Sequence, residues 1–202
     1  DVGNQIICTE QLWKTSYLKG CFDNSLAEMK KTVNLCRQVN EKHFLITALA
    51  ASNLVSLIKG NGVNEQEMQE IGHLLGDVKS FLSHTEVGLF LAEIEIQQDH
   101  MENVYKTLTG LLPIILRKNL NSEHHVPAFS MYCELAIREL LQRKTGPSRI
   151  NVSNRKLVLF YHLYSLVLLF SSLNYPAHKG SYYRSKAWWN ALKGRKNRAR
   201  RL

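Results

Sequence analysis

Proline is scarce in this chain, with four among 202 residues. A proline inside a helix removes a hydrogen bond and clashes with the preceding turn, so its scarcity leaves long stretches that can stay helical. Leu, Ala, Glu, Lys and Gln, which favour helices, recur throughout. A chain of this length with 45% apolar residues can also bury a sizeable core. The composition therefore predicts an all-α protein.

Acidic residues are missing from the C-terminal third. Residues 140–202 contain 14 Lys and Arg and no Asp or Glu, a net charge of +14. Residues 1–139 contain 12 Lys and Arg against 17 Asp and Glu, a net charge of −5. This split predicts that the two parts meet different partners and that the basic part binds something anionic. Nucleic acid, an acidic protein surface and the acidic N-terminal part of the same chain all remain candidates.

Sequence motifs that carry chemistry are also lacking. The four cysteines form no CxxC pair and show no Cys/His ligand spacing, so neither a zinc site nor a redox motif is indicated, and buried free thiols are expected. Gly60-Asn61-Gly62 is not followed by the GK[ST] of a phosphate-binding loop. His124-His125 lies in a predicted loop, where a metal would need ligands from elsewhere. We predict no catalytic site, no metal site and no cofactor.

Long hydrophobic runs are absent as well. The longest one, Leu157 to Phe170, has 14 residues and is interrupted by polar side chains. A membrane-spanning helix needs roughly 20 apolar residues. We interpret this run as a core helix and predict no membrane span.

Apolar residues recur every three or four positions, which predicts a series of amphipathic helices. Gly20, Gly60 and Asp99 lie at turns between paired helices, 40 and 39 residues apart. This spacing predicts stacked antiparallel helix pairs that repeat along the chain, with a plain helical bundle as the alternative. The predicted helices span about 22–39, 44–58, 64–82, 86–98, 101–118, 127–144, 152–173 and 187–192.

The segment Leu18 to Leu26 is similar to the inter-helix turn of tetratricopeptide-like repeats. In that turn a glycine, here Gly20, precedes an aromatic residue, here Phe22. A small residue then lets the two helices approach, and Ser25 holds that position. Trp13 departs from the pattern, because the family usually has a small residue there. The resemblance extends to about residue 120 and implies an α-solenoid whose concave face binds a peptide or a partner helix.

The C-terminal segment interleaves aromatic and basic residues. Cations release counterions from phosphates and aromatic rings can stack on unpaired bases, so nucleic acid is one candidate partner. The same basic run is typical of a nuclear localisation signal. A third interpretation is that Trp188 and Trp189 cap the last helix pair and the final residues form no site. The candidate residues for an anionic partner or for localisation are Arg184, Lys186, Trp188, Trp189, Lys193, Arg195, Lys196, Arg198, Arg200 and Arg201.

These patterns predict a helical-repeat domain at residues 1–178 and a basic aromatic tail at residues 179–202. We predict that the protein is a non-enzymatic scaffold or adaptor subunit of a multiprotein nuclear complex. Its repeats would bind other protein subunits, and its tail would direct localisation or contact nucleic acid. The alternative is a secreted, cytokine-like helical ligand, indicated by the four cysteines and a glycosylation sequon at Asn151.

Overall fold

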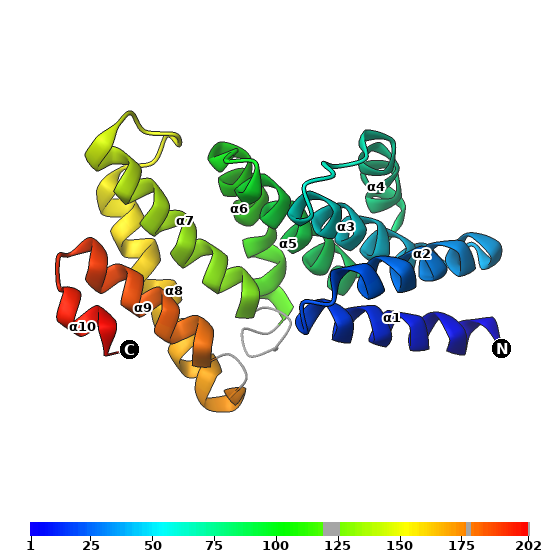
Figure 1. The fold of residues 1–202 in the computed structure, drawn as a ribbon. Coiled ribbons are helices and arrows are strands. Elements are labelled where there is room, and N and C mark those ends of the chain that lie inside the picture. Colours follow the sequence, from blue (N-terminus) through cyan, green and yellow to red (C-terminus); the bar gives the residue numbers. More distant parts are fainter. Residues whose placement is uncertain (119–125, 177–178, 202) are drawn as a thin grey trace. The chain divides into compact units, whose positions relative to one another are not determined.

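The computed structural model describes residues 1–118, 126–176 and 179–201 (Figure 1). All regular secondary structure in these residues is helical, which confirms the predicted all-α class of stacked helices. The helices are α1 (Val2–Leu18), α2 (Phe22–Val39), α3 (Lys42–Ile58), α4 (Glu65–Asp77), α5 (Phe81–Gln97), α6 (Met101–Lys118), α7 (Val126–Thr145), α8 (Asn154–Asn174), α9 (Lys179–Leu192) and α10 (Lys196–Arg200).

The chain divides into two compact units. Unit 1 is Asp1–Gln98 and contains α1 to α5, whereas unit 2 is Asp99–Leu202 and contains α6 to α10. Unit 1 has 8 Lys and Arg against 12 Asp and Glu, a net charge of −4. Unit 2 has 18 Lys and Arg against 5 Asp and Glu, a net charge of +13. The domain boundary predicted at residue 178 falls outside the described residues.

Successive helices of unit 1 stack side by side. α1 packs on α2, α2 packs on α3, and α3 packs on both α4 and α5. Ser25 of α2 is fully buried, and its hydroxyl donates a hydrogen bond of 3.0 Å to the backbone carbonyl of Trp13 in α1. A larger side chain at this position would hold the two backbones apart. The small residue after the turn therefore allows α1 and α2 to approach closely.

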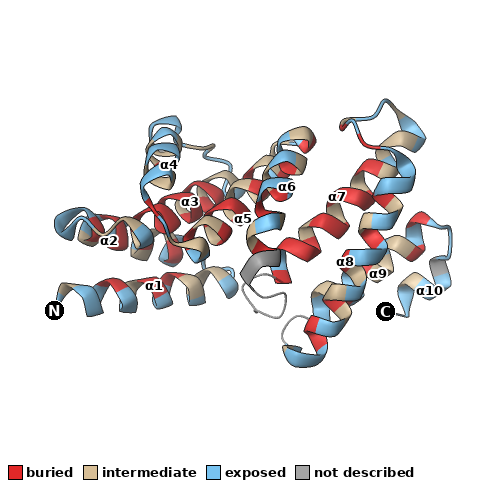
Figure 2. Ribbon diagram, turned by 180° about the vertical axis from the view of Figure 1, so that it is seen from behind, coloured by how far each residue is buried: buried red, intermediate tan, exposed pale blue. Residues whose placement is uncertain are grey.

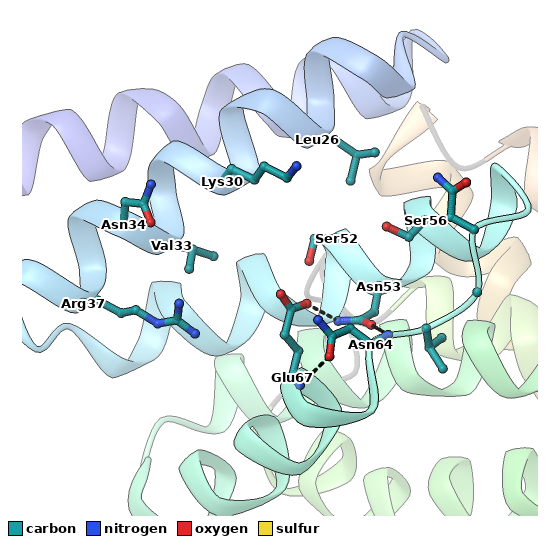
Figure 3. A pocket seen from close by; sticks show the side chains of 13 residues that line it. Leu26, Lys30, Val33, Asn34, Arg37, Ser52, Asn53, Ser56, Asn64 and Glu67 are labelled. Carbon is teal, nitrogen blue, oxygen red and sulfur yellow. Dashed lines mark hydrogen bonds between the residues drawn. The ribbon is translucent and has the colours of Figure 1, made fainter.

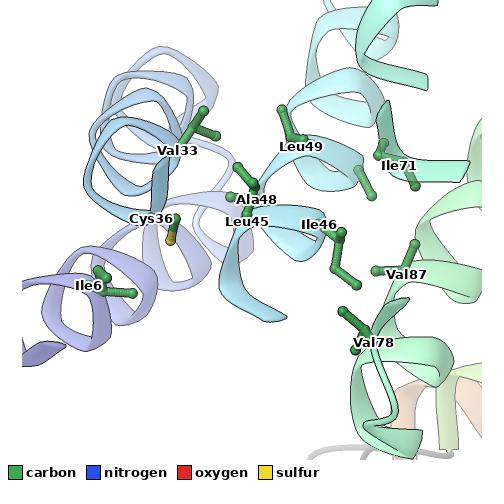
Figure 4. Close-up of a cluster of buried hydrophobic side chains, with 11 residues drawn as sticks. Ile6, Val33, Cys36, Leu45, Ile46, Ala48, Leu49, Ile71, Val78 and Val87 are labelled. Atoms are coloured by element: carbon green, nitrogen blue, oxygen red, sulfur yellow. The ribbon is translucent and has the colours of Figure 1, made fainter. Parts of the chain in front are cut away.

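The core of unit 1 is centred on α3, which is covered by neighbouring helices on more than one side. Figure 4 shows Ala48 of α3 pointing towards Cys36 of α2, while Ile46 points towards Val87 of α5. Ala48 and Ile46 have no exposed surface. Burying an isoleucine side chain contributes about 1.5–3 kcal/mol to stability. α3 is thus the helix that joins α2 to α4 and α5.

The three turn residues at the forty-residue spacing share one backbone conformation. Gly20, Gly60 and Asp99 follow α1, α3 and α5 and have left-handed φ angles of 73°, 82° and 59°. After both glycines, the N–H of the next residue donates a 2.9 Å hydrogen bond to the carbonyl five residues earlier. A left-handed residue closed by such a bond is a common helix end, and glycine and aspartate tolerate this conformation better than most residues.

One predicted helix boundary, at residues 83–85, is wrong. α4 ends at Asp77 and α5 already begins at Phe81. The Ser80 hydroxyl accepts a hydrogen bond of 3.3 Å from the backbone N–H of Ser83, so it caps the start of α5. The apolar spacing continues as far as Leu82 and hides the break, whereas the capping serine was the local signal for it.

Unit 2 is built around α7, α8 and α9, which pack on one another, with α6 on α7 and α10 on α9. Aromatic rings fill the space between them. Tyr164 of α8 stacks on Tyr132 of α7 with ring centroids 4.3 Å apart, and Tyr161 of α8 stacks on Trp189 of α9 at 4.0 Å. The buried hydroxyl of Tyr132 donates a hydrogen bond to the Leu108 carbonyl of α6. One side of α8 is therefore fixed by α7 and α9.

A buried carboxylate holds the connection between α7 and α8. Glu139 has no exposed surface. It accepts hydrogen bonds from the Ser148 hydroxyl at 2.6 Å, from Arg143 Nε at 2.8 Å and from the Arg149 backbone N–H at 3.1 Å. The Arg149 side chain also pairs with Asp99. Burial by itself would raise the pKa of Glu139, but these hydrogen bonds outweigh it and hold that pKa below its ordinary value.

Candidate protein-interaction surfaces

The basic aromatic segment is largely helical and belongs to the packed part of unit 2. α9 contacts both α7 and α8, and α10 lies against α9. Tyr182 and Ser185 are buried on the face of α9 that packs against the other helices. The Tyr161 hydroxyl donates a long hydrogen bond of 3.4 Å to the Ser185 carbonyl. Residues 179–192 are thus a structural helix as well as a candidate site.

The two neighbouring tryptophans of α9 differ in their surroundings. Trp189 lies nearly parallel to Tyr161, at 9° between the ring planes, and the Lys193 ammonium lies 5.0 Å from its ring centroid. A ring held in this way is a packing element. Trp188 keeps 39% of its surface exposed and Tyr183 keeps 44%, so these two rings are the aromatic groups of α9 that a partner can reach.

Most candidate cations of this segment are exposed. No carboxylate pairs with these exposed side chains within the described residues. Lys186 differs, because its ammonium donates a hydrogen bond of 3.0 Å to the Tyr182 hydroxyl. The side chain of Lys196 lies outside the described part of the chain. The exposed cations are Arg184, Lys193, Arg195, Arg198, Arg200 and Arg201.

Unit 1 contains a polar groove of about 450 Å³ between α2, α3 and the start of α4 (Figure 3). Lys30, Asn34 and Arg37 line the α2 side, at spacings of four and three residues that place them on one helical face. Ser52 and Ser56 line the α3 side. The remaining lining residues are Leu26, Val33, Asn53, Asn61, Gly62, Val63, Asn64 and Glu67.

A buried asparagine fixes the wall of this groove. Asn53 of α3 is 1% exposed, and its side-chain oxygen accepts a 2.6 Å hydrogen bond from the Asn64 backbone N–H. Its side-chain nitrogen donates to Glu67 at 2.8 Å and to the Leu49 carbonyl at 2.9 Å. Asn64 in turn caps α4 by accepting from the backbone N–H of Glu67. The groove wall is therefore organised by the protein itself.

The groove residues had not been identified from the sequence. Lys30 and Asn34 interrupt the apolar pattern of residues 22–39 and look like an ordinary solvent-facing side of a helix. The opposite wall comes from residues 52–67, and only the packing of α3 on α2 brings the two together. The one sequence signal was the cluster of Asn and Gly at 61–64, which interrupts the helical pattern.

All four cysteines are free, and they fall into two classes. Cys36 in unit 1 and Cys133 in unit 2 are buried, as expected, and burial raises the pKa of each thiol to about 12. Cys8 and Cys21 are exposed, which corrects the expectation that all four would be buried. Both lie at the surface of α1 and the turn that follows it.

The described residues contain no group of three or more His, Cys, Asp and Glu side chains that could hold a metal ion. The His124-His125 pair lies outside these residues. Two candidate surfaces in the described residues are the polar groove on unit 1 and the cationic segment on unit 2. No protein-family model, curated protein or solved structure matches this chain.

Proposed function

We propose that this chain is an adaptor or scaffold subunit in which unit 1, built from tetratricopeptide-like helix pairs, binds a segment of a protein partner. The observation that carries the proposal is the polar groove between α2 and α3, whose far wall is held by Asn53. A groove formed in advance costs little conformational entropy when a ligand binds. The left-handed Gly20 and Gly60, each in a turn between two helices that pack on each other, support the repeat interpretation.

The chemistry of the groove favours an extended peptide that carries carboxylates. Lys30 and Arg37 are exposed on the α2 side, and Asn34 between them offers an amide. Lys30 supplies a positive charge to the groove, whereas the charge of Arg37 is balanced by Glu70 and a second carboxylate, Glu67, lines the opposite wall. Arg37 pairs with Glu70 at 2.6 Å, so it is oriented before a ligand arrives. Leu26 and Val33 add an apolar surface between the polar groups. A peptide with acidic residues and one small apolar side chain fits this combination.

Reversing charge in the groove is expected to remove the protein partners of unit 1. The test is affinity purification from nuclease-treated cell extract, comparing the full chain with a Lys30→Glu/Asn34→Asp variant. We expect the recovery of specific partner proteins with this variant to fall at least tenfold, because both substitutions place negative charge against an acidic segment of the partner. Lys31→Glu is the matched control, since Lys31 is exposed on the same helix but does not line the groove. Equal recovery with all three proteins would contradict the proposal.

We also propose that the cations after α9 direct the chain to the nucleus. Truncation at residue 178 is a poor test, because it removes Trp189 and uncovers Tyr161. Substitution of Arg195, Arg198 and Arg200 by glutamine removes charge without removing a helix. We expect a fluorescent fusion carrying these substitutions to lose its nuclear enrichment in cells. Unchanged nuclear enrichment would exclude a localisation role for these residues.

A further inference from the structure

α8 carries two apolar stripes, and its neighbours cover only one of them. Figure 2 shows buried and exposed residues alternating along this helix. The covered stripe consists of Leu157, Tyr161, Tyr164 and Leu168 and ends at the small polar Ser171, each at most 4% exposed. The second stripe, here named the outer seam, consists of Leu159, Leu163, Leu166, Phe170 and Leu173, which are 64%, 51%, 54%, 61% and 66% exposed. Five large exposed apolar residues in one row are costly in water and mark an interaction site.

The spacing of the outer seam matches a second helix. Its intervals are four, three, four and three residues, the heptad pattern of helices that pair along their length. At about 100° per residue the five side chains fall within roughly 80° of the helix circumference, on the side opposite the covered stripe. Val158, Phe160, Val167 and Leu169 lie half-buried on either side of this row, so the outer seam is the most exposed centre of a broader apolar face.

α8 also has the length and composition of a membrane-spanning helix, the one such helix in the described residues. Its most apolar 18-residue window is 33% buried in the protein, so most of that window is not covered by the neighbouring helices. If α8 left unit 2 and inserted into a bilayer, the stacked rings of Tyr161 and Trp189 and those of Tyr164 and Tyr132 would be separated. The packing of the covered stripe therefore favours a role in which α8 stays in unit 2.

The charges at the start of α8 and in unit 2 as a whole indicate what kind of helix the outer seam binds. Arg155 and Lys156 are exposed at the start of α8, directly before the seam. Residues 140–202 contain no Asp or Glu, and unit 2 as a whole has a net charge of +13. A second copy of α8 would bring more positive charge and no carboxylate. A helix with acidic residues beside its apolar row would neutralise these cations, and complementary charge also speeds association.

We propose that the outer seam binds an amphipathic helix of another protein, with leucine-like residues at the heptad positions and Asp or Glu beside them. This interaction is independent of the groove on unit 1, because it uses a different unit and different chemistry. The two surfaces together would let one chain hold an acidic extended segment and an acidic helix.

The test uses the full chain and two synthetic helical peptides of three heptads with identical Ile and Leu positions. One peptide has Glu at the flanking positions and the other has Lys. We expect the Glu peptide to bind at least tenfold more tightly in a fluorescence anisotropy titration. A Leu163→Gln/Leu166→Gln variant should weaken its binding at least tenfold, without adding charge. Leu141→Gln, on the exposed side of α7, is the matched control and should bind like the unmodified chain.

Three results would overturn the proposal. The first is equal affinity for the two peptides, or no binding of either one. The second is a dimer of the unmodified chain in sedimentation that the double variant dissociates, because the seam would then be occupied by a second copy. The third is flotation of the unmodified chain with vesicles of anionic lipid that the double variant abolishes, which would assign the seam to a membrane surface. Circular dichroism confirms that each variant is folded before binding is compared.

Discussion

Replacing Glu139 with glutamine is expected to lower the free energy of unfolding of unit 2 by about 3–5 kcal/mol, because it removes one member of a buried charged network. The amide cannot accept from Ser148, Arg143 and the Arg149 N–H as the carboxylate does. It also leaves the Arg143 charge, which is largely buried, without its partner. Guanidinium unfolding followed by circular dichroism measures the change.

Glu134→Gln provides the control for this substitution. Glu134 also pairs with an arginine four residues later on α7, Arg138, at 2.7 Å. That pair is partly exposed, and such surface pairs contribute only about 0–1 kcal/mol. If both variants lose the same small amount of stability, the network around Glu139 does not hold the α7–α8 connection.

The effect of Glu139 should also depend on pH. Since its pKa is lower in the folded protein than in the unfolded chain, the ionised carboxylate stabilises the fold fully above the unfolded-state pKa of about 4.3. This contribution is lost as the pH falls through the folded-state pKa. The stability difference between the unmodified chain and Glu139→Gln should therefore be largest near pH 7 and shrink in acid.

Trp13→Ala is expected to lower the free energy of unfolding of unit 1 by about 3–5 kcal/mol, the usual effect of removing a large buried aromatic side chain. Trp13 is 1% exposed and packs with Met29 of α2 and with Val55 of α3. Its ring also lies 6.3 Å from that of Phe90 in α5. Alanine would leave a cavity where α1, α2, α3 and α5 meet.

The neighbouring Leu12→Ala substitution is the control for Trp13→Ala. Leu12 is 54% exposed on the same helix, and surface substitutions usually change stability by less than about 0.5 kcal/mol. Thermal and guanidinium unfolding of both variants give the comparison. A loss below about 1 kcal/mol for Trp13→Ala would show that α1 contributes little to the stability of unit 1.

The fold was predictable from local signals where these were strong. The predicted helix at 22–39 has the same limits as α2, because the left-handed Gly20 lies in the turn before it and Asn40 ends it in a left-handed conformation. The α4–α5 break was missed because the apolar pattern runs across it. The bulky Trp13, where a small residue was expected from the resemblance, is buried against Met29, Val55 and Phe90, while Ser25 contacts its backbone carbonyl.

The candidate surfaces were much less predictable, because each depends on residues far apart in the chain. Trp189 is a packing residue only because Tyr161, 28 positions earlier, stacks against it. The groove exists because α3 packs on α2, and no periodicity predicts a hollow between them. The apolar run at 157–170 reads as uniformly buried in sequence. Only the positions of α7 and α9 decide which of its residues stay exposed.

The two buried cysteines allow the two units to be followed separately by alkylation kinetics. Cys36 and Cys133 are each the single buried thiol of their unit, whereas Cys8 and Cys21 are open to reagent from the start. Two thiols should therefore react at once, and the other two only when their own unit opens. When each unit opens and closes faster than an exposed thiol is alkylated, the alkylation rate of its buried cysteine measures the free energy of opening of that unit. The natural sequence thus carries one internal reporter for each half of the chain, without added label or mutation.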